Sequence, residues 1–262
     1  MNSEKVVSHV VNWLQLYAQN SGVKGFVVGV SGGIDSAVTS TLCAKTGFPT
    51  ICVEMPIHQD PNQVSRAQEH IEKLKDRYSN VSSVRTDLTA PFETFQKAVP
   101  TSESTNLKAL VLANTRARMR MTSLYYIAGM HSSLVVGTGN KVEDFGVGFY
   151  TKYGDGGVDV SPIADLMKSE VFALAAVLGV PDSIQKAAPT DGLFGDSRTD
   201  EDQLGASYDE LEWAMKMQNG GNHSKVFSDR EKEVYEIYIR LNTANQHKMQ
   251  PIPVCVIPAH LK

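Results

Sequence analysis

Apolar residues recur along the first half of the chain with two different spacings. In residues 4–20 they fall three or four positions apart, which predicts an amphipathic helix. After this helix, short β-branched runs alternate with helical segments. The predicted strands are Phe26–Val30, Thr50–Met55, Val81–Leu88 and Leu134–Gly137, and the predicted helices cover residues 36–46, 62–78 and 106–130.

This alternation indicates an α/β fold: a doubly wound parallel sheet with helices on both faces, because several strands are apolar on both sides. Ligands of such sheets bind beyond the carboxyl ends of the strands. We therefore expect the loops after Val30, Met55 and Gly137 to line one crevice. A single domain over residues 1–262 is predicted, with its sheet inside residues 22–180.

The composition of the chain changes near residue 180. Residues 189–205 (PTDGLFGDSRTDEDQLG) are rich in Gly, Asp, Ser and Thr, which is typical either of a solvated surface loop or of a mobile lid. A helical C-terminal tail is expected over residues 206–262. It contains helical patches at 208–217 and 229–243 and is broken by prolines after residue 247.

Charge and cysteine content narrow the class of protein. A net charge of −4 and a pI near 6.0 argue against a nucleic-acid binder or a membrane-surface protein. The three cysteines are scattered and the seven histidines show no metal-ligand spacing, so neither a disulfide framework nor a zinc site is expected. The chain shows no secretory leader and no apolar run of about 18 residues, so a cytoplasmic protein is predicted.

The stretch Phe26–Ala37, FVVGVSGGIDSA, combines a strand, a glycine turn and a helix start. It is neither a Walker A loop nor G-x-G-x-x-G, but two serine hydroxyls and a helix N-terminus could still hold a phosphate. Asp35 would repel that phosphate unless a cation stood between them, so the aspartate predicts Mg²⁺ and a polyphosphate. The alternative is a plain glycine turn in which Asp35 favours the helix start.

Two later stretches carry further candidate chemistry. The arginines of Asn114–Met121, NTRARMRM, form either a solvated stripe or an anion site. In Gly137–Gly157, Thr138 follows an apolar strand and should reach the crevice, and Glu143 could be a second carboxylate on Mg²⁺. Its sequence FYTKYGDGG collects aromatics, a lysine and an aspartate among glycines, which a purely structural loop rarely needs.

SGGIDSA resembles the pyrophosphate-binding loop of the ATP pyrophosphatase superfamily, SGGxDS. With FYTKYGDGG, Ala-Pro-Thr at 188–190 and His247–Lys248 in the same order, the chain resembles the ammonia-dependent NAD synthetases. The resemblance implies an adenine nucleotide α-hydrolase-like fold and a homodimeric ligase for the last step of NAD biosynthesis. Such an enzyme adenylates deamido-NAD with Mg²⁺–ATP and amidates it with ammonia, giving NAD, AMP and pyrophosphate.

The resemblance also implies roles for individual residues. ATP would contact Gly29, Val30, Ser31, Gly32, Gly33, Ile34, Asp35, Ser36, Thr138, Lys168 and Thr190, and the adenine would lie near Met55 and Gln59. Deamido-NAD would contact Arg118, Lys152, Asp159, His247 and Lys248. Asp35 and Glu143 would hold Mg²⁺, Lys168 would neutralise phosphate oxygens, and either Asp155 or Asp159 would take a proton from ammonium.

The chain departs from the family pattern in three places. Gly139 stands where many members have Asp, the segment from Glu143 to Lys152 is one residue longer than in some, and EMPIHQDPNQ after the second strand is unusual. Two rivals are a tRNA thiolase, which would need reactive cysteines and a basic face, and an ATP-sensing module without turnover. About 28 residues precede the phosphate loop, so we expect free ammonia, or ammonia from a separate protein, as the nitrogen donor.

Overall fold

The computed structural model describes residues 1–101, 104–188, 199–220 and 227–262. Its centre is a four-stranded parallel sheet with the strand order β3-β2-β1-β4. The strands are β1 (Gly25–Gly29), β2 (Thr50–Glu54), β3 (Val81–Arg85) and β4 (Ser133–Val136). Because β4 lies on the other side of β1 from β2 and β3, the direction of winding changes between β1 and β4. This is the place where doubly wound sheets bind ligands.

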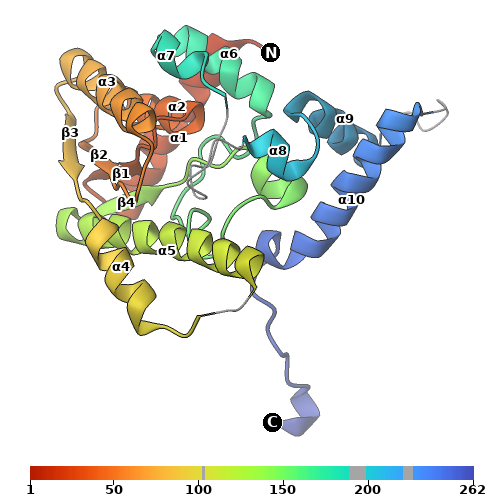
Figure 1. Ribbon diagram of the computed structural model, residues 1–262. Helices are drawn as coiled ribbons and strands as arrows, with labels where there is room; N and C mark the ends of the chain where they lie inside the picture. The colour runs from red at the N-terminus through yellow and green to blue at the C-terminus, as the bar shows by residue number, and fades with distance from the viewer. Residues whose placement is uncertain (102–103, 189–198, 221–226) are drawn as a thin grey trace.

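Helices cover both faces of the sheet, as the alternating side chains of β1 require (Figure 1). Phe26 and Val28 pack into one apolar core and Val27 into another. The first core and a smaller cluster beside it contain residues of α1 (Ser3–Ser21), α2 (Ile34–Lys45), α3 (Pro61–Arg77) and α6 (Lys168–Leu178). The other face carries α4 (Thr89–Ala98) and α5 (Thr105–His131). The predicted fold class is therefore confirmed.

A second core lies beside the sheet (Figure 1). It joins the π-helical turn η1 (Val142–Val147) to three helices, and Val142, Leu211 and Tyr238 are buried within it. These helices are α8 (Asp200–Leu204), α9 (Tyr208–Gln218) and α10 (Asp229–Met249), and a short α7 (Asp182–Gln185) precedes them. We call η1, α8, α9 and α10 together the small core. α9 and α10 begin at the starts predicted for the two helical patches.

Two predicted boundaries change in the structure. The strand predicted over Val81–Leu88 ends at Arg85, because Leu88 turns inward and its N–H donates to the carbonyl of Pro56 (3.0 Å). α4, which was not predicted, follows immediately and buries Phe92. Most of the predicted loop 189–205 lies outside the described residues, and the part that is described forms α8.

The chain ends in an exposed arm, residues 250–262, which contains the short 3₁₀ turn η2 (Ala259–Leu261). Val254 is 79% exposed and Val256 80%, and the arm extends away from the body of the molecule (Figure 1). Within the described ranges, none of the helices is both long and apolar enough to cross a bilayer.

Candidate active site

A cavity of about 290 Å³ lies at the carboxyl ends of the central strands. Its walls include Val30 after β1, Met55 after β2 and Thr138 after β4. These are the three loops that the sequence predicted to meet, and they meet because parallel strands end at one edge of the sheet. All of the predicted phosphate-binding residues from Gly29 to Ser36 line the same cavity.

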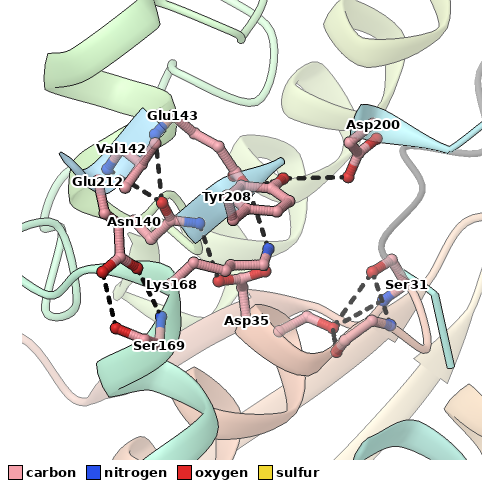
Figure 2. A network of polar contacts seen from close by, with 12 residues as sticks. Ser31, Asp35, Asn140, Val142, Glu143, Lys168, Ser169, Asp200, Tyr208 and Glu212 are labelled. Carbon is pink, nitrogen blue, oxygen red and sulfur yellow. Dashed lines mark hydrogen bonds and ion pairs between the residues drawn. The ribbon is translucent and has the colours of Figure 1, made fainter. Parts of the chain in front are cut away.

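The phosphate loop is held by its own hydroxyls (Figure 2). Ser31 N–H donates to Ser36 Oγ (3.2 Å), and Gly33 N–H donates to Ser31 Oγ (3.2 Å). Gly32 has a φ of +84°, and a Cβ there would lie 2.4 Å from the carbonyl oxygen of Gln63 on α3. Only glycine suits this position. The loop thus passes close to α3 before α2 begins.

Two carboxylates from distant parts of the chain converge on one ammonium beside this loop. Lys168 Nζ donates to Asp35 Oδ2 (2.6 Å) and to Glu143 Oε1 (2.9 Å), as Figure 2 shows. Asp35 stands in the first turn of α2, Glu143 in η1 and Lys168 at the start of α6. A pair of carboxylates that already enclose one cation suits a hard divalent ion supplemented by phosphate and water oxygens.

The three side chains affect one another's ionisation. At Asp35 burial outweighs the attraction of Lys168 and raises the pKa of the carboxyl. Burial of Lys168 opposes its charge, but Asp35 and Glu143 outweigh that effect and raise the pKa of the lysine. Burial would likewise raise the pKa of Glu143, yet Lys168 and the hydroxyl of Tyr208 together hold it below its ordinary value. Lys168 is therefore an ammonium and Glu143 a carboxylate at neutral pH.

Asn140 holds both the Asp35 carboxylate and the backbone of Glu143, a role that the sequence analysis missed. It is fully buried, and its Nδ2 donates to Asp35 Oδ1 (3.1 Å). Its Oδ1 accepts from the N–H groups of Val142 and Glu143 (3.1 and 3.2 Å), which anchors the start of η1. The signal that could have revealed it is an amide side chain four residues after the apolar strand β4, which ends at the crevice.

The small core contributes two further side chains that the sequence analysis missed (Figure 2). Tyr208 OH donates to Glu143 Oε1 (2.6 Å) and lies 3.3 Å from Asp200 Oδ2. Glu212 accepts from both the N–H and the hydroxyl of Ser169, each at 2.8 Å, and so anchors the first turn of α6 that carries Lys168. Both come from α9, which has no sequence link to the phosphate loop.

Two more carboxyls, those of Asp144 and Asp155, line the cavity. The Asp144 carboxyl fills the space beside Gly139, where a Cβ would lie 2.2 Å from its oxygens. Burial, together with nearby Glu143 and Asp155, raises the pKa of Asp144 well above its ordinary value. Loss of surrounding water raises the pKa of Asp155 to about 6, although the N–H of Thr151 partly opposes the rise. One wall of the cavity is thus strongly acidic.

Comparison with known proteins shows the family of the chain. The family model described as NAD synthase matches residues 6–252. The chain belongs to the NAD synthase family. The NH(3)-dependent NAD(+) synthetase of Syntrophomonas wolfei is 35% identical over 267 residues, which cover 100% of both chains.

Solved structures give the same result. The NMN synthetase of Francisella tularensis is 31% identical, with a TM-score of 0.82 over 99% of both chains. The NH3-dependent NAD synthetase of Campylobacter jejuni is 26% identical, with a TM-score of 0.78, and the match covers 98% of this chain and 100% of that one. Both likenesses extend over the sheet and the small core.

Four of the five residues expected to contact deamido-NAD are connected by hydrogen bonds outside the cavity wall. Arg118 Nε donates to the carbonyl of Lys152 (3.3 Å), and Lys152 Nζ donates to that of His247 (2.6 Å). Lys248 Nζ donates to the carbonyls of Gly148 and Tyr150 (2.7 and 2.8 Å). These four basic residues connect α5, the loop after η1 and the end of α10. We call them the basic cluster.

The two aspartates left open by the sequence differ in position. Asp155 lines the cavity, whereas Asp159 lies off its wall. The Asp159 carboxylate accepts from Tyr125 OH (2.9 Å) and from the N–H of Val135 in β4 (2.8 Å). The geometry therefore favours Asp155 for chemistry inside the cavity and gives Asp159 a place beside β4.

The adenine contacts expected after β2 are near the cavity. Met55 and Gln59 both line it, and Arg120 holds them together by donating to the carbonyl of Met55 (3.0 Å) and to Gln59 Oε1 (2.9 Å). Thr190 lies outside the described residues. Their contacts with ATP remain predictions.

Proposed function

We propose that this chain adenylates deamido-NAD with Mg²⁺–ATP and amidates the product with ammonia, forming NAD, AMP and pyrophosphate. The family match and the NH(3)-dependent NAD(+) synthetases at about 35% identity support the reaction. The observation that carries it is the convergence of Asp35 and Glu143 on Lys168 beside the phosphate loop. That arrangement provides cation-binding carboxylates next to a site for polyphosphate.

Asp35 and Glu143 would hold Mg²⁺, which would neutralise charge on the leaving pyrophosphate. Within the described residues no cluster of three or more His, Cys, Asp or Glu can hold a metal. Two carboxylates with phosphate and water oxygens are nevertheless the usual surroundings of Mg²⁺. The residues present therefore fit the ion.

The chain's own residues would perform the first step by positioning charge. Ser31, Ser36 and the start of α2 line the cavity. Their N–H groups and hydroxyls would bind phosphate oxygens. Lys168 would release one carboxylate and offer its ammonium to the phosphates. The nicotinate carboxylate, directed by the basic cluster, would then attack the α-phosphate.

Asp155 would serve the second step. Ammonia exists mostly as ammonium at neutral pH, so a proton acceptor must stand near the acyl carbon. A carboxyl with a pKa of about 6 is ionised at neutral pH and matched to that task. Its position on the wall of the same cavity as the phosphate loop supports the assignment.

A second copy of the chain is the proposed partner. α5 exposes Leu107, Leu110 and Val111, each close to half accessible, and the C-terminal arm exposes a further apolar set on the same chain. In a two-fold dimer the same surface patch of each subunit forms the interface. An interface that includes α5 and the arm would therefore cover both apolar sets. We place the basic cluster beside the interface, because Arg118 belongs to α5 and Lys248 to the end of α10, which the arm follows.

One reaction tests the proposal: purified chain with ATP, Mg²⁺, deamido-NAD and an ammonium salt, followed for NAD, AMP and pyrophosphate. Equal amounts of all three are expected, and none without deamido-NAD. Asp35→Asn should abolish pyrophosphate release with no loss of secondary structure, whereas exposed Asp76→Asn should leave the rate unchanged. Normal pyrophosphate release from Asp35→Asn would contradict the metal role.

A second acceptor follows from the likeness to the Francisella tularensis NMN synthetase, which has the higher TM-score of the two structures compared above. The same chemistry on nicotinate mononucleotide would give NMN. The assay should therefore compare both acceptors by kcat/KM. A clear preference for the mononucleotide would replace the substrate while keeping the reaction type.

A further inference from the structure

Tyr208 touches two members of the charged trio at once. Its side chain is buried at 6% exposure. Its hydroxyl donates to Glu143 Oε1 (2.6 Å), and its ring centroid lies 4.7 Å from Lys168 Nζ (Figure 2). An ammonium at that distance from an aromatic ring is attracted to it. Both contacts therefore act on groups that the proposed reaction requires.

The small core holds this tyrosine rigidly. Ser207 caps α9 by accepting from Glu210 N–H, and the Glu210 carboxylate accepts from Ser207 N–H in return. The N–H of Tyr208 donates to Glu201 Oε1 (2.9 Å), which joins it to α8. Leu211, one turn further along α9, is fully buried in the same core. The phenol is thus presented from a fixed helix start.

Glu143 needs such support for two reasons. It lies in a single π-helical turn, and its donor Lys168 also donates to Asp35. Its Oε1 accepts from both Lys168 and Tyr208. A tyrosine hydroxyl has one proton, and the 2.6 Å contact to Glu143 is shorter than the 3.3 Å contact to Asp200, so the proton points to Glu143. When Lys168 turns to the phosphates of ATP, the phenol remains in place as a donor.

We propose that Tyr208 is a positioning residue that orients Glu143, and through it the cation, while its ring keeps Lys168 in place for the nucleotide phosphates. This inference rests on the proposed function. It assigns a task to α9 that the sheet alone cannot perform. The small core would then contribute directly to the binding of Mg²⁺–ATP.

The test compares Tyr208→Phe with Tyr235→Phe. Tyr235 lies in the same core, and its hydroxyl donates to Gln218 (2.6 Å) away from the cavity. ATP binding is measured by calorimetry with Mg²⁺ and again with EDTA. Because a hydrogen bond to a charged group is worth about 1.5–3 kcal/mol, Tyr208→Phe should weaken Mg²⁺–ATP binding by about tenfold or more. Binding in EDTA should change little, and Tyr235→Phe should match the wild type in both.

A double-mutant cycle tests the route through Glu143. In a Glu143→Gln background, adding Tyr208→Phe should cause little further loss of Mg²⁺–ATP binding, because the oriented carboxylate is already gone. Equal losses in both backgrounds, or equal losses with Mg²⁺ and EDTA, would overturn the proposal. An unchanged affinity of Tyr208→Phe for Mg²⁺–ATP would also overturn the proposal. If the unmutated chain does not bind Mg²⁺–ATP at all, the proposed function fails first, which keeps the two failures distinguishable.

Discussion

Lys168 Nζ lies 2.6 Å from Asp35 Oδ2, although 133 positions separate the two residues along the chain. Both side chains are largely enclosed, at 4% and 17% exposure. Glu143 completes the group from a third element. A buried cation between two carboxylates stabilises the fold only while all three are present, since a lone buried charge is costly. The candidate site and the stability of the fold are therefore linked.

Replacing Lys168 with Met should destabilise the chain strongly. The substitution leaves Asp35 and Glu143 facing each other without a cation, which should lower the free energy of unfolding by about 3–5 kcal/mol. Urea unfolding followed by circular dichroism measures this loss. Lys186→Met is the control, because the Lys186–Asp182 pair is 78% exposed on both sides. That variant should unfold at nearly the same urea concentration as the unmutated chain, because exposed ion pairs contribute little. Similar losses in both variants would contradict the stabilising role of the buried trio.

Ionisation of Asp155 should control the acidic side, or limb, of the pH profile of the amidation rate, with an apparent pKa of about 6. The carboxylate accepts a proton only when ionised, so the rate at a constant concentration of free ammonia should rise through that pH and then level. Asp155→Asn should lose the limb and most of the rate, with Asp159→Asn as the comparison. A limb that persists in Asp155→Asn would return the role to Asp159 or to another group.

Asp144→Asn should stabilise the chain at pH 8. The folded pKa of Asp144 is raised above its ordinary value of 3.8, so the folded chain binds the proton more tightly than the unfolded chain does. Ionisation of Asp144 therefore lowers the free energy of unfolding by an amount that grows as pH rises above about 4. Below that pH this loss of stability is absent. Thermal scans should show Tm rising by about 2–4 °C at pH 8 and little at pH 3.5. Exposed Asp76→Asn serves as control, and an equal Tm shift at both pH values would refute the argument.

Ending the chain at Met249 should remove the proposed dimer. The arm carries Ile252, Val254 and Val256 into solvent at 66–80% exposure, and covering them should favour association. Light scattering after gel filtration should show a dimer for the full chain and a monomer for the truncated one. Cys255→Ser, which keeps the apolar residues, should stay dimeric. A truncated chain that remains dimeric would place the interface elsewhere.

The phosphate loop and the sheet could be predicted because their signals are local. FVVGVSGGIDSA contains its strand, turn and helix start in one stretch. Its glycines indicate a tight turn, and Gly32 does have a positive φ that favours glycine. Tyr208, Glu212 and Asn140 could not be found in this way. Their partners stand 65, 43 and 105 residues away. Their roles arise only when the small core packs against η1 and α6.

The structural position of Gly139 shows the same limit. In the sequence it was only a departure from the family pattern, a glycine where many members have Asp. In the structure a Cβ at Gly139 would lie 2.2 Å from the carboxyl oxygens of Asp144, which stands in the π-helical turn η1. The need for glycine at position 139 is therefore visible only after the backbone is known.

The trio also connects two separate apolar cores. Asp35 and Lys168 belong to the elements packed on the sheet, whereas Glu143 and Tyr208 belong to the small core. Local opening of the small core would pull Glu143 from its lysine without unfolding the strands. A ligand that bridges Asp35 and Glu143 would oppose that opening. Amide hydrogens of α9 and α10 should then exchange more slowly when nucleotide is bound, even though neither helix carries the phosphate loop.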